Sequence, residues 1–279
     1  MLFAKLFAAI VLGLAAATVR AASPPASDEP AAWWALGSDY VLGLGVVYGP
    51  EYEGADRGAF KARPIWAFTV GKVHLSGSGA SAIQSFASLP VGPGLSAEVL
   101  STERLRVGLG LRYDSGRDSG NFPRLAGVHD VRGTLRGRLS ASYKLHRDWS
   151  ARAEISQDLL ARQGGAELRV NLNYLHMISG TTSVLAELGF SMADSEYMRT
   201  RFGVSAADAA GTAFPAHEPD AGVKDVHLSV GAMTALTPRW VAYARAGVSS
   251  LTDDARASPL TRRASSASVS VGIAYRCCR

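Results

Sequence analysis

A histidine placed two positions before a serine is the arrangement in this sequence with the most catalytic potential. His227 and Ser229 have this spacing, and a histidine within reach of a serine hydroxyl can activate it as a nucleophile. A three-residue match carries little information, and its parity places both side chains on an inward face, away from any lipid substrate. His176 and Ser179 form a second combination, but no supporting Asn-Gly follows them. We therefore predict that the chain has no catalytic residues and is not an enzyme.

The remaining histidines, cysteines and glycines do not form a metal or cofactor motif. The six histidines are dispersed, and the sequence has no His-x-x-x-His or Cys-x-x-Cys spacing. Cys277 and Cys278 are adjacent, so they cannot close the loop of a disulfide scaffold. The glycines at 43, 45 and 49 lie within a predicted strand and open no helix, so they do not form a nucleotide-binding loop. The sequence predicts neither a metal ion nor a cofactor.

The spacing of the arginines is the clearest polar pattern. The chain has 29 lysines and arginines and 24 acidic residues, which gives a net charge of +5. The arginines alternate with apolar residues instead of forming one exposed patch, which argues against nucleic-acid binding. Because alternate residues of a strand share one face, we expect these charges to line the inside of a barrel. The candidate lumen charges are Arg104, Arg106, Arg112, Arg136, Arg138, Arg152, Arg169, Glu154, Glu167 and Glu187. The same alternation along the strands places five further charged residues on the inward face: Arg132, Lys144, Asp158, Arg245 and Arg276.

Two interpretations of this lumen remain open. In the first, arginine–carboxylate pairs fill it and no solute passes. In the second, it is a narrow pore whose excess positive charge favours anions. Arg106, Arg136 and Arg138 are expected on neighbouring strands, where they would repel one another without counter-ions or water.

Apolar residues recur at every second position through most of the chain. Leu105, Val107, Leu109, Leu111 and Tyr113 form one such stripe, and arginines and glycines occupy the positions between them. Most segments of this kind have about 9–12 residues, the length that a tilted strand needs to cross a bilayer, whereas strands of soluble proteins are about half as long. About twelve strands are predicted, near 39–49, 59–70, 72–80, 94–101, 103–113, 131–145, 148–159, 165–177, 181–193, 225–236, 239–250 and 266–276.

The connections between these segments are alternately tight and long. Tight turns are predicted at Gly71-Lys72, Thr102-Glu103, His146-Arg147, Ser179-Gly180 and Thr237-Pro238. Longer links are predicted at 50–58, 81–93, 114–130, 160–164, 194–224 and 251–265, and we expect Asp118, Ala209 and Ala255 in them to be accessible from outside the cell. Bacterial outer-membrane barrels have short periplasmic turns and long extracellular loops. A soluble β-sandwich or barrel accounts for the alternation of residues, but not for the strand length, the loop asymmetry or the charged face. The predicted fold is therefore all-β: a transmembrane antiparallel β-barrel of about 12 strands.

The first residues resemble an export signal. Lys5 precedes an uncharged apolar run at 6–17, which is too short to cross a bilayer. Small residues at Val19 and Ala21 suit a signal peptidase. We expect a cleaved signal peptide at 1–21, a periplasmic leader at 22–38 and an outer-membrane barrel at 39–279, with outer-membrane lipid and lipopolysaccharide around it.

The chain resembles the MipA/OmpV family of outer-membrane proteins, most strongly after residue 100. The residues that carry the resemblance are Phe202-Gly203-Val204-Ser205, Ala221-Gly222-Val223-Lys224-Asp225-Val226, Leu236-Thr237-Pro238-Arg239-Trp240, Leu251 with Asp254, Ala255, Ser258 and Pro259, and, earlier, Tyr113-Asp114-Ser115-Gly116-Arg117-Asp118 with Leu125-Ala126-Gly127. One departure concerns the C-terminus, where family members usually end in an aromatic residue that the barrel-insertion machinery reads. This chain has Cys277, Cys278 and Arg279 there.

The resemblance implies a barrel without catalytic activity. Family members have been described as scaffolds that join a lytic transglycosylase to a penicillin-binding protein during peptidoglycan (murein) synthesis. Others have been described as porin-like or stress-responsive surface proteins. The expected function is therefore an envelope scaffold, and the alternative is a narrow porin-like channel for small anionic solutes. The expected partners are the barrel-insertion machinery and these two murein enzymes.

Overall fold

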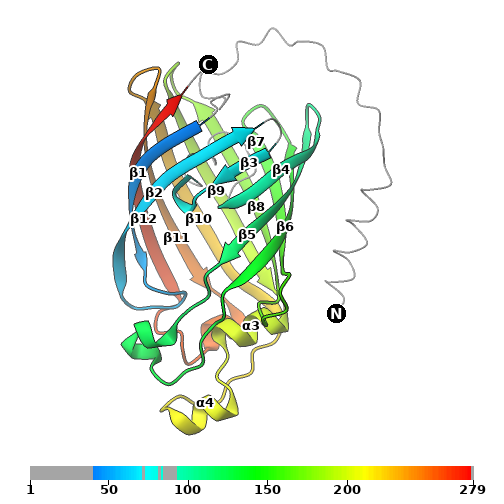
Figure 1. The fold of residues 1–279 in the computed structure, drawn as a ribbon, viewed down its shortest axis with the longest axis vertical. Helices are drawn as coiled ribbons and strands as arrows, with labels where there is room; N and C mark the ends of the chain where they lie inside the picture. Colours follow the sequence, from blue (N-terminus) through cyan, green and yellow to red (C-terminus); the bar gives the residue numbers. More distant parts are fainter. Residues whose placement is uncertain (1–39, 71–72, 81–82, 84–92, 278–279) are drawn as a thin grey trace. The chain divides into compact units, whose positions relative to one another are not determined.

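Twelve antiparallel strands close into one barrel in the computed structural model (Figure 1), which describes residues 40–70, 73–80, 83 and 93–277. Each strand pairs with its neighbour in sequence, and β12 pairs with β1 to complete the ring. The strands are β1 (Tyr40–Pro50), β2 (Gly58–Val70), β3 (Val73–Ser76), β4 (Gly94–Ser101), β5 (Leu105–Asp114), β6 (Thr134–Lys144), β7 (Trp149–Asp158), β8 (Ala166–Met177), β9 (Thr182–Ala193), β10 (Gly222–Ala235), β11 (Trp240–Leu251) and β12 (Ser265–Cys277). The predicted all-β barrel of about twelve strands is confirmed.

The outer face of the barrel is apolar and exposed. In β1, Leu42 and Leu44 are 45% and 57% exposed, whereas Val41, which alternates with them and faces inward, is 4% exposed. The same alternation exposes Leu109 in β5 and Leu172 in β8. A continuous apolar surface of this extent is unusual on a protein surrounded by water, and it matches the lipid-facing band of a transmembrane barrel.

Aromatic residues meet at the ends of strands. At the end of the barrel where the tight turns lie, Trp149 packs on Tyr174 with ring centroids 5.0 Å apart, and Trp240 packs on Tyr275 at 5.4 Å. These are the positions at which aromatic girdles sit in the headgroup region of a bilayer.

The third strand is much shorter than expected. The prediction of a spanning strand at 72–80 is wrong, because β3 ends at Ser76 and the chain turns into the 3-10 helix η1 (Ser78–Ala80). Beyond β3, the Gly77 N–H donates one more backbone hydrogen bond to β2, to the Trp66 carbonyl at 3.0 Å. Pro64, two residues earlier in β2, has its missing N–H on this same side of the strand. A proline there costs no ladder hydrogen bond, because the pairing has already ended.

The remaining connections alternate in length as predicted. Residues 102–104, 145–148, 178–181 and 236–239 make short turns at one end of the barrel, closed by bonds such as that from Ile178 N–H to Thr182 O at 2.9 Å. We call this end the turn face. The long links lie at the opposite end, where Figure 1 shows α3 (Ser195–Phe202) and α4 (Ala206–Gly211).

Four long links pack together over the barrel end as a loop cap, which consists of residues 51–57, 115–133, 194–221 and 252–264. One hydrophobic cluster joins α3 to α5 (Asp253–Ala257), and a second brings together residues of all four links. The second cluster contains Leu125, Val128, Val204 and Leu260, with Tyr52, Phe122, Ala209 and Phe214 packed against it. The cap also contains the 3-10 helices η3 (Ser119–Asn121) and η4 (Pro123–Leu125).

The short helices of the cap are fixed by side-chain caps. The Asp194 carboxylate accepts from the Tyr197 N–H at the start of α3, and Ser205 and Asp208 form a reciprocal capping box on α4. No helix in the described part of the chain is long and apolar enough to cross a membrane. Ala255, which was expected to be accessible, is fully buried in the α5 region of the cap. That expectation was wrong, because a long link can carry a hydrophobic cluster of its own.

The predicted signal peptide and leader at 1–38 lie outside the described residues, as do most of 81–93 and the turn at 71–72.

Candidate functional site: the barrel lumen

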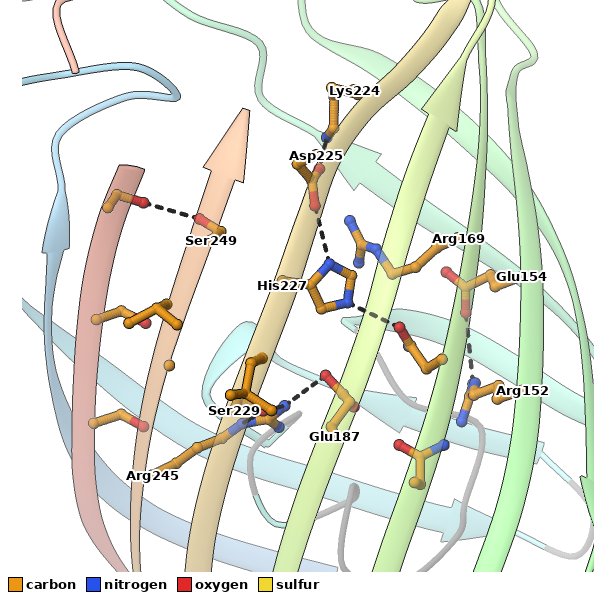
Figure 2. A pocket seen from close by; sticks show the side chains of 18 of the residues that line it. Arg152, Glu154, Arg169, Glu187, Lys224, Asp225, His227, Ser229, Arg245 and Ser249 are labelled. Carbon is orange, nitrogen blue, oxygen red and sulfur yellow. Dashed lines mark hydrogen bonds and ion pairs between the residues drawn. The ribbon is translucent and has the colours of Figure 1, made fainter. Parts of the chain in front are cut away.

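The inward-facing side chains of the strands enclose a cavity of about 600 Å³ (Figure 2). Charged and hydroxyl-bearing residues from β5 to β12 and from the loop cap form most of its lining. We call this space the lumen cavity. Its volume is within the range of roughly 300–1,000 Å³ that is usual for small-molecule sites.

Arginines from four successive strands form one wall of the lumen cavity, the arginine wall. It consists of Arg112 on β5, Arg138 on β6, Arg152 on β7 and Arg169 on β8. Strand register places Arg138 opposite Gly110, where the lack of a side chain makes room for the guanidinium. A Cβ atom at position 110 would lie 3.3 Å from Arg138 Nη2.

Two carboxylates neutralise part of this wall. Glu154 lies between two arginines, with its oxygens 3.6 Å from Arg138 Nη1 and 3.5 Å from Arg152 Nη2. Glu167 lies 3.3 Å from Arg169 Nη2. Burying an unpaired ion costs several kcal/mol, so these pairs are what permits so many arginines on one inward face.

Lys224 is the centre of a second charged group, beneath the loop cap. Its Nζ donates to Glu167 Oε1 at 2.7 Å and to Glu53 Oε1 at 3.0 Å, and lies 3.4 Å from Asp225 Oδ2. Glu53 belongs to the loop cap and Glu167 to β8, so a single buried cation ties the cap to the barrel wall.

Tyr197 of α3 contacts Lys224. Its hydroxyl oxygen accepts from Lys224 Nζ at 3.4 Å, and its ring centroid is 5.3–5.4 Å from the charged groups of Arg136, Arg201 and Lys224. Burial raises the pKa of Tyr197, and the nearby Glu167 and Glu53 carboxylates raise it further, so the phenol stays neutral. Its ring face is therefore available for cation–π contacts with three buried cations.

The wall opposite the arginines is lined with small hydroxyl groups. It consists of Ser249 of β11 and Ser266, Ser268 and Ser270 of β12, and we call it the serine wall. Five strands lie between β12 and β6 on either side of the ring of twelve, so this wall faces the arginine wall across the lumen. Ser249 and Ser266 share a hydrogen bond of 2.9 Å.

His227 and Ser229 both face the lumen, but they do not act on each other. His227 Nδ1 lies 2.9 Å from Asp225 Oδ1, and its Nε2 lies 2.8 Å from Asn171 Oδ1 (Figure 2). The Ser229 hydroxyl accepts instead from Arg245 Nη2 at 2.7 Å. With both ring nitrogens occupied elsewhere, His227 cannot take a proton from Ser229 in this arrangement.

The second histidine–serine combination is also separated. His176 Nδ1 lies 3.0 Å from Asp148 Oδ2, whereas the Ser179 hydroxyl accepts from backbone N–H groups of its own turn. In the part of the chain that the structure describes, no three His, Cys, Asp or Glu side chains gather as they would around a metal ion.

The other candidate lumen charges have three different positions. Glu187 lines the cavity and pairs with Arg245 at 2.8 Å. Arg136 is buried beneath the cap, where it donates to the carbonyls of Ser156, Gly164 and Gly165. Arg104 lies in a turn and is exposed, and Arg106 is exposed opposite Ser142 near the turn face. Arg106 therefore lies apart from Arg136 and Arg138, with which it was expected to cluster.

The other charged residues that were predicted to face inward also lie in different parts of the barrel. Asp158 accepts from the backbone N–H groups of Leu160, Arg162 and Gly164 and so organises the β7–β8 link. Lys144 is exposed at the turn face, and Arg276 donates to Pro238 O there. The alternation of residues in the sequence did not predict that Lys224 faces inward. A β-bulge between Val223 and Asp225 turns two consecutive charged side chains, Lys224 and Asp225, inward.

Known proteins resemble this chain in fold or in sequence. A search of curated proteins found no match. Among solved structures, a "NanC porin structure" is 9% identical, with a TM-score of 0.46 and coverage of 84% of this chain and 100% of that one. A "KdgM porin" is 12% identical, with a TM-score of 0.42 and coverage of 84% and 98%. An "anion-selective porin from Comamonas acidovorans" is 11% identical, with a TM-score of 0.39 and coverage of 85% and 98%. The sequence profile described as "MltA-interacting protein MipA" matches residues 42–277, which is nearly the whole span from β1 to β12, and the chain therefore belongs to this family.

Proposed function

We propose that this chain is a non-enzymatic barrel of the bacterial outer membrane that acts as an interaction protein of the cell envelope, connected with murein synthesis. The loop cap is the observation that carries this proposal. One hydrophobic cluster, through Ala193 of β9 and Leu251 of β11, and the Lys224 ion pairs hold the cap on the barrel, and the second cluster holds the links of the cap together. We propose that a solute would have to displace the cap in order to pass. The family's description names an interaction with MltA, and a lytic transglycosylase of that kind is the partner we propose here.

The turn face is the surface that we propose for docking. It carries exposed basic side chains on three separate turns, from Arg104, Lys144, Arg147 and Arg239. Each turn alone is small, and a stable interface usually buries more than about 1,000 Å². A partner would therefore have to contact several turns at once.

The test is a pull-down of a purified lytic transglycosylase by the full chain in detergent. Charge reversal at two turns, Arg147→Glu with Arg239→Glu, should abolish or strongly weaken capture, because it removes electrostatic complementarity with an acidic partner surface. Arg256→Glu in the loop cap, at the opposite end of the barrel, is the matched control and should leave capture unchanged. Equal capture by the double variant and the control would contradict docking at the turn face.

A narrow anion pore is the second candidate, and the composition of the lumen favours it. The cavity lining contains six cationic side chains and four carboxylates among the described residues. Planar-bilayer recording on the purified chain tests this function. Steady conductance with a reversal potential that indicates anion selectivity would support the pore. A silent bilayer would leave the interaction role.

A further inference from the structure

We infer that the cap end of the barrel binds a phosphorylated lipid of the outer leaflet, lipopolysaccharide, through three exposed arginines next to the lipid-facing surface. They are Arg57, Arg262 and Arg263, and we call them the rim arginines. This inference goes beyond the envelope interaction role and concerns the end of the barrel opposite the turn face. Three observations carry it: the rim arginines have no acidic partner in the described chain, backbone contacts bring them onto adjoining links, and lipid-facing aromatic rings lie beside them.

The rim arginines are accessible and are not neutralised by the described part of the chain. All three are exposed, and no ion pair or side-chain hydrogen bond among the described residues includes them. On the neighbouring link, the Glu53 carboxylate binds Lys224 and the Asp56 carboxylate lies 3.3 Å from Arg124. The Glu51 carboxylate makes no ion pair with the rim arginines, and neither do the acidic residues of α5. Their guanidinium groups are therefore open to an anion from outside the chain.

Two backbone hydrogen bonds hold the rim arginines on adjoining links. The Gly54 carbonyl accepts from the Arg262 N–H at 2.8 Å and from the Arg263 N–H at 3.1 Å. Gly54 has a positive φ of 91°, and a Cβ atom there would lie 2.9 Å from Thr261 Oγ1, so a glycine is what lets the two links approach. Arg57 is on the same link as Gly54 and immediately precedes β2. The fold thus gathers these cations at the cap ends of β2 and β12, the two strands on either side of β1.

The same strands have an apolar, lipid-facing side next to the rim arginines. Tyr48 of β1 and Phe60 of β2 are exposed near the cap end, with ring centroids 4.8 Å apart. Val269 of β12, which pairs with Tyr48, is exposed as well. The same alternation, continued past the start of β12, puts Arg263 on the outer side, whereas Ala264 packs inward against the cluster of α3 and α5. An aromatic pair beside exposed arginines matches a lipid with both acyl chains and phosphate groups.

The chemistry of this surface selects a phosphorylated lipid. A guanidinium can bind two phosphate oxygens at once, and basic side chains near a membrane surface attract anionic head groups. Free phosphate would contact only the arginines, whereas a lipid would also place its acyl chains on the exposed apolar side of β1, β2 and β12. Long loops of outer-membrane barrels face the exterior, where the lipid A part of lipopolysaccharide carries phosphates. Lipopolysaccharide is therefore the lipid that this surface fits.

The test is native mass spectrometry on the full chain, folded in detergent and titrated with diphosphoryl lipid A. Monophosphoryl lipid A has one phosphate fewer, glucosamine 1-phosphate has the phosphate without acyl chains, and phosphatidylglycerol is an anionic lipid with a different head group. Diphosphoryl lipid A should bind at least about tenfold more tightly than each of these, because only it brings two phosphates together with acyl chains. Its affinity should fall as the salt concentration is raised. Equal binding of the two lipid A forms, or equally tight binding of glucosamine 1-phosphate or phosphatidylglycerol, would overturn the inference.

A double substitution assigns the binding to the rim arginines. Arg57→Gln with Arg263→Gln should weaken diphosphoryl lipid A binding by at least about tenfold and should remove the preference over the monophosphoryl form. The double variant should fold, because both side chains are exposed. Arg162→Gln is the matched control, since it removes an exposed arginine from the link between β7 and β8, across the ring from β1. It should bind within about twofold of the native chain.

A folded double variant that binds diphosphoryl lipid A with native affinity would contradict the assignment to the rim arginines. Folding is checked for each variant by the electrophoretic shift between unheated and boiled samples. A failed transglycosylase pull-down would leave these binding results unaffected, because the turn face lies at the other end of the barrel. The two proposals therefore fail separately.

Discussion

Lys224 shows at the residue scale how the cap and the barrel are joined. It is 1% exposed, and it lies within 3.4 Å of carboxylate oxygens from Glu53, Glu167 and Asp225. Removing one partner of a buried ionic group leaves charges of the same sign in a medium that solvates them poorly. The group is therefore worth more as a whole than any of its pairs.

We predict that Lys224→Met lowers the free energy of unfolding by about 3–5 kcal/mol, because three carboxylates then lose their shared cation. Guanidinium unfolding of the barrel in lipid vesicles measures the change. Lys144→Met removes a lysine that is exposed at the turn face and should change the stability by less than about 0.5 kcal/mol. Similar losses in the two variants would mean that Lys224 contributes no more than a surface charge.

Asp208 gives the cap a predictable pH dependence. Burial would raise the pKa of its carboxyl, but hydrogen bonds from the His129 ring, the Ser205 hydroxyl and the Ser205 N–H outweigh burial and hold the pKa below its ordinary value of 3.8. A carboxyl with a lowered pKa stabilises the folded form above pH 3.8 and loses this contribution as the pH falls through the lower, folded-state pKa. We expect protease cleavage of the cap to increase as the pH is lowered below about 3.8 in the native chain. Asp208→Asn should be cleaved more readily at neutral pH and should show a smaller pH dependence. A variant with the native profile would contradict the assignment.

At the scale of elements, the strands could be predicted from the sequence because lipid and lumen impose opposite demands on alternate residues. The stripe from Leu105 to Tyr113 gave β5 and its two faces correctly. Where other forces act, alternation fails as a guide. β3 ends at Ser76 because a Gly-Ser-Gly run follows it, and the bulge at Lys224 reverses the parity of one residue. The small helices of the cap have too few residues for a clear helical period, so the burial of Ala255 could not be predicted.

The lipid-facing side of the strands gives a prediction at this same scale. Leu109 lies near the middle of β5 and Leu172 near the middle of β8, and both side chains point outward. Leu109→Arg or Leu172→Arg should destabilise the barrel in vesicles by about 2–4 kcal/mol, because each places a charge near the bilayer midplane. Leu145→Arg, just beyond the end of β6 at the turn face, should cost no more than about 1 kcal/mol. Equal effects at all three sites would mean that the outer face does not contact hydrocarbon.

At the scale of the whole molecule, the barrel has two unlike ends. One carries short turns with exposed arginines, and the other carries a cap built from four links with hydrophobic clusters of their own. Accessibility within the cap depends on packing as well as on topology. Ala255 is fully buried and Ala209 packs against the second cluster, so neither position reports which side of the membrane the cap occupies.

Exposed positions in the cap can report the topology of the whole barrel. Asp118, Ala207 and Ala257 are exposed in three different links, whereas Thr102 and Thr237 are exposed on the turn face. In a background without the two native cysteines, single cysteines at the three cap positions should react with a membrane-impermeant thiol reagent on whole cells, because long loops of outer-membrane barrels face the exterior. Cysteines at the two turn positions should react only after the outer membrane is permeabilised. The permeabilised sample is the control for intrinsic reactivity, since all five side chains are then within reach of the reagent. Labelling of Thr102→Cys or Thr237→Cys on intact cells would mean that the turn face lies outside the cell. The turn face would then not face the periplasm, where the proposed docking to a murein enzyme has to occur.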